Sequence, residues 1–76
     1  MDNKEFYINK SKNMIKATAN IKGYNLSALN ELLNTDREKK TTFQNFNQKI
    51  NNGSIRFIEV LEIADKLGLN IQFIDK

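Results

Sequence analysis

Amide side chains are concentrated on one side of a short helix predicted for residues 42–51. Gln44 and Gln48 are four residues apart, so a helix places them on one face with Asn45 beside them. The donor and acceptor of a Gln or Asn amide match the acceptor and donor that adenine presents in the major groove. The pattern is therefore typical of a helix that reads base edges, and the same side chains also suit a solvated helix face.

The opposite side of this predicted helix carries Phe43, Phe46 and Ile50. Their spacing of three and four residues predicts packing on a hydrophobic core. Phe43 stands in the first turn, where three roles remain open: core packing, contact with a thymine methyl group or contact with a protein partner. Thr41 or Thr42 is a suitable N-cap, because a Thr hydroxyl accepts a hydrogen bond from the first turn.

Five basic residues flank or belong to this helix: Arg37, Lys39, Lys40, Lys49 and Arg56. The first three fall in segment 34–40, which is charged and aperiodic and is predicted to be a loop. Cations beside a base-reading helix neutralise phosphates and supply affinity that falls with added salt. For the loop residues, solubility is an equally good interpretation.

Positive charge is concentrated in the part of the chain that contains the amide-rich helix. Residues 1–52 hold nine Lys or Arg and five Asp or Glu, whereas residues 53–76 hold three and four. The net charge of the whole chain is +3. This asymmetry favours a polyanionic partner.

Hydrophobic periodicity predicts four helices, at residues 11–22, 26–34, 42–51 and 56–67. A glycine follows each of the first, third and fourth helices, as expected for a helix that ends in a left-handed residue. Asn25 is the expected N-cap of the second helix. In the fourth helix we expect five side chains to face the core: Phe57, Val60, Leu61, Ala64 and Leu67.

The pattern changes after Gly68, where apolar and polar residues alternate and predict a β-strand at 69–74. A strand needs a partner, either residues 5–9 in an N-terminal arm (1–10) or the same strand of a second copy. The apolar side chains of the two termini exceed what a small helical core can cover. We expect a homodimer whose interface contains Phe6, Ile8, Leu69, Ile71, Phe73 and Ile74.

The composition excludes several kinds of chemistry. The chain of 76 residues has no Cys and no His, which excludes disulfides, Cys/His zinc sites and His general-base catalysis. There is no Gly-rich phosphate loop and no spacing typical of a calcium loop, so we expect neither an enzyme nor a metal or other cofactor. No apolar run is long enough to span a membrane and the start lacks a secretory signal. We expect one domain, residues 1–76, in the cytoplasm.

Segment 41–68, TTFQNFNQKINNGSIRFIEVLEIADKLG, resembles the lambda-repressor-like helix-turn-helix family, the Cro-repressor and xenobiotic-response-element class. It is most similar to small regulators of phages and mobile elements whose last helix runs into a short strand. The resemblance covers roughly residues 13–74. It implies an all-α bundle of four helices with a short C-terminal β-strand, which binds double-stranded DNA as a dimer.

The resemblance also implies a role for individual residues. Base contacts would come from Thr42, Phe43, Gln44, Asn45 and Gln48. Backbone contacts would come from Asn52, Ser54 and Arg56, in addition to Arg37, Lys39, Lys40 and Lys49. The expected function is a sequence-specific DNA-binding transcriptional regulator of the repressor type, which reads the major groove with helix 42–51 as a homodimer.

A second function is compatible with the same scaffold, namely a phage- or mobile-element-encoded protein that binds and inhibits a host enzyme. Three departures from the family pattern favour it. Leu26 stands where the family often has Gln, Phe43 stands where a polar reader is common, and the connection at 34–41 is longer than the usual turn. The basic first half and the amide-lined helix favour the DNA-binding function.

Overall fold

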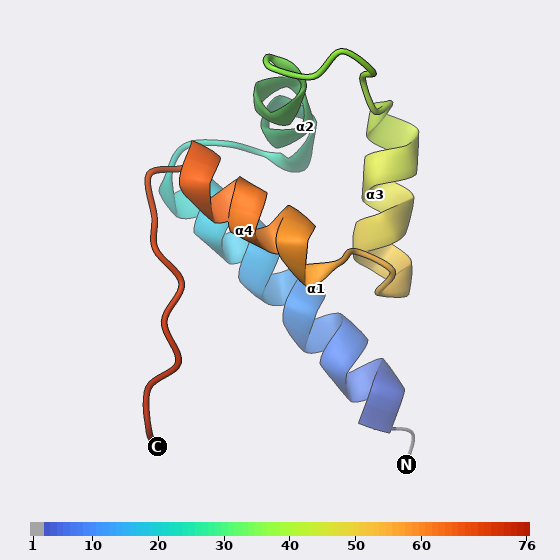
Figure 1. Ribbon diagram of the computed structural model, residues 1–76. Coiled ribbons are helices and arrows are strands. Elements are labelled where there is room, and N and C mark those ends of the chain that lie inside the picture. The colour runs from blue at the N-terminus through green and yellow to red at the C-terminus, as the bar shows by residue number, and fades with distance from the viewer. Residues whose placement is uncertain (1–2) are drawn as a thin grey trace.

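Helices account for all the regular secondary structure of residues 3–76, the part of the chain that the computed structural model describes (Figure 1). They are α1 (Asn3–Ile21), α2 (Leu26–Asn34), α3 (Phe43–Asn52) and α4 (Phe57–Lys66). The predicted all-α class with four helices is therefore confirmed. None of the described helices is long and apolar enough to cross a membrane.

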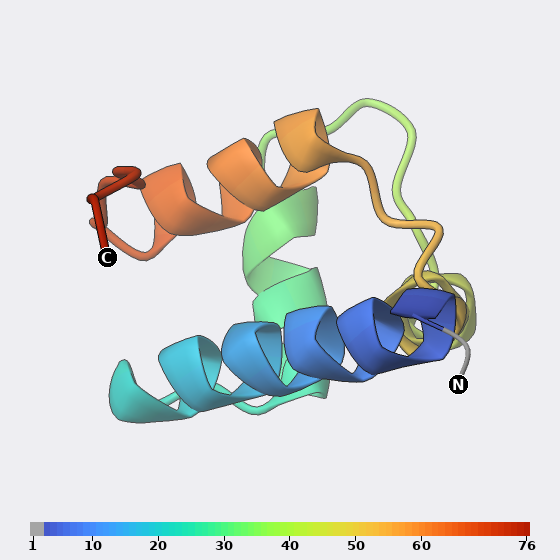
Figure 2. The ribbon, with the colours of Figure 1, turned by 90° about the horizontal axis from the view of Figure 1, so that it is seen from below.

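One small core holds the four helices together. Every helix contributes to it: Ile15 and Ala19, Leu29 and Leu33, Phe46 and Ile50, and Ile63, with Leu67 directly after α4. Viewed from below, α2 lies between α1 and α4, and α3 stands at one end of this layer (Figure 2). α3 packs against α1 and α2, so its orientation is set by two helices at once.

Local capping fixes where the helices begin. The Asn25 side chain accepts a hydrogen bond from the Ala28 backbone N–H at 2.8 Å, and Thr42 Oγ1 accepts one from the Asn45 N–H at 3.2 Å. Both satisfy backbone donors that a helix start leaves unpaired. The prediction of Asn25 as a cap is confirmed, and of the two candidates before α3 the cap is Thr42.

The prediction of an N-terminal arm is wrong for the described residues 3–10, because they belong to α1. Residues 1–2 of the predicted arm lie outside the described part of the chain. Ile8, Ile15 and Ala19 follow one side of this longer helix. Ser11 and Lys12 occupy the intermediate turn and are half-buried. Because Ser11 and Lys12 are polar, the sequence pattern does not show that the apolar stripe continues through this turn. In the structure a Lys can still lie there, since its stem packs on apolar surface while its ammonium stays in water.

The assignment of inward residues in α4 is wrong at two positions. Phe57 and Leu61 are exposed, whereas Ile63, which was not among the expected core residues, is buried. Phe57, Ile58 and Leu61 instead form an exposed apolar side of α4. Periodicity alone does not distinguish this side from the core side, because both are apolar.

The predicted strand at 69–74 is not formed in this single chain. Residues 69–76 have no regular secondary structure, and the described residues contain no strand. Figure 1 shows the segment running back from the end of α4 as an extended chain. One of its two possible partners, residues 5–9, is part of α1, so the backbone groups of that segment already form helical hydrogen bonds. No described segment is available to pair with it.

Close contact between α1 and the end of α3 generates a first prediction. Gly53 has φ +75°, and a Cβ built there would lie 2.5 Å from Ile8 Cγ1; Gly23 has φ +87° and nothing within 4 Å of such a Cβ. Both Gly→Ala changes should lower the free energy of unfolding by about 1–2 kcal/mol, because alanine is disfavoured in the left-handed conformation. Gly53→Ala should cost about 1–3 kcal/mol more than Gly23→Ala, because the contact with Ile8 is overpacked.

Urea denaturation of the two variants measures this difference. Combining Gly53→Ala with Ile8→Ala should remove most of the extra cost, because the clashing side chain is gone. Equal destabilisation by Gly53→Ala and Gly23→Ala would show that residues 3–10 do not pack against α3.

Candidate nucleic-acid interface

The exposed side of α3 is made of amides. Burial of Phe46 (3% exposed) and Ile50 (1%) fixes the rotation of the helix. Five amide side chains then line one open hollow of about 440 Å³ on the outer surface: Gln44, Asn47, Gln48, Asn51 and Asn52. We call this surface the amide face. It offers both hydrogen-bond donors and acceptors, with no charged side chain among its lining residues.

A second hollow of about 410 Å³ adjoins the amide face on the side of the α2–α3 loop. We call it the basic hollow, and it is lined by Lys39, Lys40, Thr41, Asn45, Gln48, Lys49, Asn52 and Ser54. The structure thus brings together two of the predicted base-contact residues, Asn45 and Gln48, with five of the predicted phosphate contacts. Lys39 has no polar or charged partner in the described part of the protein, so its ammonium faces solvent.

Two predicted base-contact residues at the start of α3 have other surroundings. Phe43 is 43% exposed and is not part of the buried core, although its spacing from Phe46 predicted core packing. It lies one turn before the residues that the core covers. Thr42 is exposed, but its hydroxyl oxygen already accepts the capping hydrogen bond.

Two asparagines that sequence reasoning missed hold the loop between α2 and α3. Asn34 pairs with the Thr41 backbone in both directions: Nδ2 donates to the carbonyl oxygen at 2.8 Å and Oδ1 accepts from the N–H at 2.9 Å. Buried Asn30 donates to the same carbonyl at 3.0 Å. These hydrogen bonds therefore fix the position of Thr41, and with it the start of α3. Their spacing of four on α2, one face of a helix, was the only signal in the sequence.

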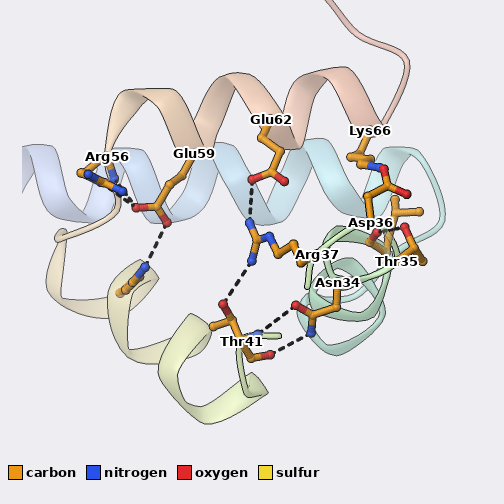
Figure 3. Close-up of polar contacts among 11 residues, drawn as sticks. Asn34, Thr35, Asp36, Arg37, Thr41, Arg56, Glu59, Glu62 and Lys66 are labelled. Atoms are coloured by element: carbon orange, nitrogen blue, oxygen red, sulfur yellow. Dashed lines mark hydrogen bonds and ion pairs between the residues drawn. The ribbon is translucent and has the colours of Figure 1, made fainter. Parts of the chain in front are cut away.

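A row of ion pairs joins α4 to the loop and to α3 (Figure 3). Glu62 Oε1 accepts from Arg37 Nη2 at 2.6 Å, and Asp36 pairs with Lys66. Glu59 accepts from Lys49 Nζ at 3.2 Å and from Arg56 Nε at 3.3 Å. Three of the predicted phosphate contacts, Arg37, Lys49 and Arg56, are thus paired with carboxylates of α4.

The side chain of Glu59 is only 16% exposed. Burial raises the pKa of Glu59, while hydrogen bonds from Lys49 and from the backbone and side chain of Arg56, together with the charge of Lys49, lower it further than burial raises it. The net result is a pKa below the ordinary value of 4.5. Glu59 is the third residue after Arg56, the N-cap of α4, and this is the position of the acidic residue in a capping box. Its Oε1 accepts a hydrogen bond from the Arg56 backbone N–H at 3.4 Å.

The predicted dimer residues do not form one cluster. Ile8 packs on Gly53, whereas Phe6 lines a shallow hollow on α1 together with Met14. Met14 also lines an apolar groove of about 390 Å³ between α1, α4 and the C-terminal segment. The other apolar side chains lining this groove are Ile15, Phe57, Val60, Ile63, Ala64, Leu69, Ile71 and Phe73. Phe73 stacks on Phe57 with ring centroids 6.2 Å apart, yet it remains 90% exposed.

The described residues contain no group of three or more acidic side chains arranged to hold a metal ion. No protein-family model matches the chain, and no curated protein or solved structure matches it significantly. The geometry of α3 and its surroundings is therefore the basis for assigning a function.

The ion pairs of Glu59 generate a prediction about pH. Because its pKa is lowered in the folded state, its contribution to stability is present above about pH 4.5 and is lost as the pH falls through the lower folded-state value. Glu59→Gln should lower the free energy of unfolding by about 1 kcal/mol near neutral pH. The difference from the unaltered protein should shrink at acidic pH.

Urea denaturation over a series of pH values tests this. Glu31→Gln on the exposed side of α2 is the matched control, because it removes the same charge away from the ion pairs. If Glu59→Gln and Glu31→Gln followed the same pH dependence, the ion pairs of Glu59 would not stabilise the fold.

Proposed function

We propose that this protein is a sequence-specific DNA-binding regulator that places α3 in the major groove. The observation that carries the proposal is the amide face of α3 beside the basic hollow. Amides of Gln and Asn pair with adenine through two hydrogen bonds, each such pair being worth about 1–3 kcal/mol of discrimination. Lysines next to a base-reading surface supply the sequence-independent part of the affinity.

The arrangement of α2 and α3 supports a helix-turn-helix assignment. In that motif the second helix enters the groove and the first lies across the DNA backbone. α2 and α3 pack on each other, and the amide face points away from the core. The connection between them is longer than a typical turn, but Asn30 and Asn34 hold its end at Thr41. A fixed connection serves the same purpose as a short turn, because it keeps the recognition helix in place.

The absence of arginine from α3 narrows the proposed target. Arg is the most common specific partner of guanine, whereas Gln and Asn suit adenine. The amide face contains no Arg or Lys. The proposed operator therefore has A·T pairs at the positions that Gln44 and Gln48 contact.

The proposed DNA-binding form is a homodimer. Phe57, Ile58 and Leu61 expose the apolar side of α4, and the apolar groove and the C-terminal segment lie next to it. An apolar surface of this kind marks an interaction site in a small protein. Pairing of residues 69–74 with the same segment of a second copy would give the predicted strand the partner that a single chain lacks.

The second candidate function is binding to a host protein, and one observation favours it. Phe43 is an exposed aromatic side chain at the N-terminal end of α3, and aromatic side chains are enriched at protein interfaces. Phe43 on a DNA-binding surface would instead contact a thymine methyl group. The two functions differ in whether duplex DNA binds at all.

DNA binding is tested with two duplexes of about 20 base pairs, long enough for two half-sites. One is selected from a random library by repeated binding, and the other is its scrambled sequence. Gln44→Ala or Gln48→Ala should weaken the selected duplex by about 1–3 kcal/mol and leave the scrambled duplex nearly unchanged. Lys39→Ala should weaken both and reduce the salt slope by about one unit.

Asn20→Ala is the control for the amide changes, because Asn20 is exposed on α1. Fluorescence anisotropy at about 50 and about 200 mM salt gives the affinities and the slope. If no duplex binds at the lower salt concentration, the DNA-binding function is wrong. Equal weakening of both duplexes by the Gln changes would contradict base recognition by α3.

The dimer is tested by analytical ultracentrifugation. The unaltered protein should sediment as a dimer at high micromolar concentration, and Leu61→Glu should make it monomeric, because a charge cannot be buried unpaired at the interface. Phe43→Glu is the matched control, an equally exposed apolar residue on α3. A monomeric unaltered protein, or a dimer that tolerates Leu61→Glu, would contradict this interface.

A further inference from the structure

Glu59 and Glu62 lie on one side of α4 and face the α2–α3 loop and α3 (Figure 3). We call them the carboxylate pair. Glu62 holds Arg37, and Glu59 holds both Lys49 and Arg56. A carboxylate oxygen and a phosphate oxygen are the same kind of partner for these cations. The protein therefore places its own anions where the proposed function expects those of DNA.

The position of Lys49 allows an anion outside the protein to compete with Glu59. The carboxylate pair lines an open hollow of about 330 Å³, which is distinct from the basic hollow, and Lys39 and Lys49 line both. Lys49 thus has Glu59 on one side and the base-reading amides Asn45 and Gln48 on the other. Its side chain is 42% exposed, so it is accessible to an anion outside the protein. In the structure it pairs with Glu59.

Both carboxylates are already engaged by hydrogen bonds within the protein. Glu62 accepts a hydrogen bond of 2.6 Å from Arg37, which also donates to Thr41 Oγ1 at 3.1 Å. Glu59 receives the Arg56 backbone N–H in addition to two cationic side chains. A DNA phosphate that takes one of these cations must therefore break or share an existing ion pair.

We propose that the carboxylate pair is an autoinhibitory contact that weakens the hold of Arg37, Lys49 and Arg56 on DNA phosphates. The inference rests on the proposed function and adds regulation to it. The amide face does not contact the carboxylate pair, so base preference is independent of it. Removing a carboxylate frees a cation and raises the affinity for the selected and the scrambled duplex by a similar factor.

Glu62→Gln is the first test, because Gln keeps an acceptor for Arg37 while it removes the charge. Affinity for both duplexes should rise roughly three- to tenfold at low salt. The salt slope should grow by about one unit, corresponding to one additional phosphate contact. Glu59→Gln should act in the same direction through Lys49 and Arg56. Glu31→Gln, which removes the same charge from the exposed side of α2, should change little.

A double-mutant cycle separates release of a cation from a simple loss of repulsion. In an Arg37→Gln background, Glu62→Gln should have little further effect, because there is no cation left to release. Circular dichroism and urea denaturation of each variant check that the helices are retained and that the variant is folded under the binding conditions, Glu59→Gln included.

Three outcomes would overturn the inference. Glu62→Gln and Glu59→Gln could bind no better than Glu31→Gln, or the gain from Glu62→Gln could persist without Arg37. In both cases the unaltered protein still binds DNA, so the proposed function stands and only the autoinhibitory contact fails. If neither the unaltered protein nor the variants bind any duplex, the proposed function and this inference fall together.

Discussion

Burial of one side of α3 is the interaction on which the rest of the structure depends. Phe46 and Ile50 join a core to which all four helices contribute. A chain of this length buries only about 60% of its unfolded surface, so there is one core and no second one to compensate for it. Because these two side chains fix the rotation of α3, they also decide that the amides face outward. The stability of the fold and the composition of the candidate site have the same cause.

Polar contacts then fix what hydrophobic burial leaves free. The chain from 35 to 42 has no regular structure, yet Asn30 and Asn34 hold the Thr41 backbone in place. The ion pairs of α4 hold the same loop from the other side (Figure 3). Each exposed ion pair contributes little to stability alone. Together they position the loop, because each one restricts a different part of it.

The same ion pairs change how the charge of the protein should be understood. A net charge of +3 suggests cations available to any polyanion. In the folded protein Arg37, Lys49 and Arg56 already have carboxylate partners. In the described part of the chain the loop cations Lys39 and Lys40 have none, and Lys40 Nζ donates to the Asn34 carbonyl instead. The electrostatic attraction of any polyanion is therefore set by the arrangement of charges in three dimensions. Net charge is a poor guide to this attraction, because Coulomb interactions depend on the distance between charges.

The amino-acid sequence by itself determined the local features. Period-3.6 patterns and capping residues located α2, α3 and α4 to within about a residue, because helix starts and hydrophobic stripes are set by neighbours in the chain. The amides and Lys49 could be named as candidates for the same reason. The start of α1 could not, because half-buried Ser11 and Lys12 interrupt its apolar stripe.

The tertiary structure decided everything that depends on residues distant in the sequence. It turned Phe57 and Leu61 to the surface and Ile63 to the core, because the side of α4 that carries Ile63 is the one that joins the core shared with the other helices. It paired Arg37 with Glu62, 25 residues away, and it left residues 69–76 without a strand partner. Local periodicity carries no information about such choices. They are settled by which surfaces meet when the helices pack, and that depends on the whole chain at once.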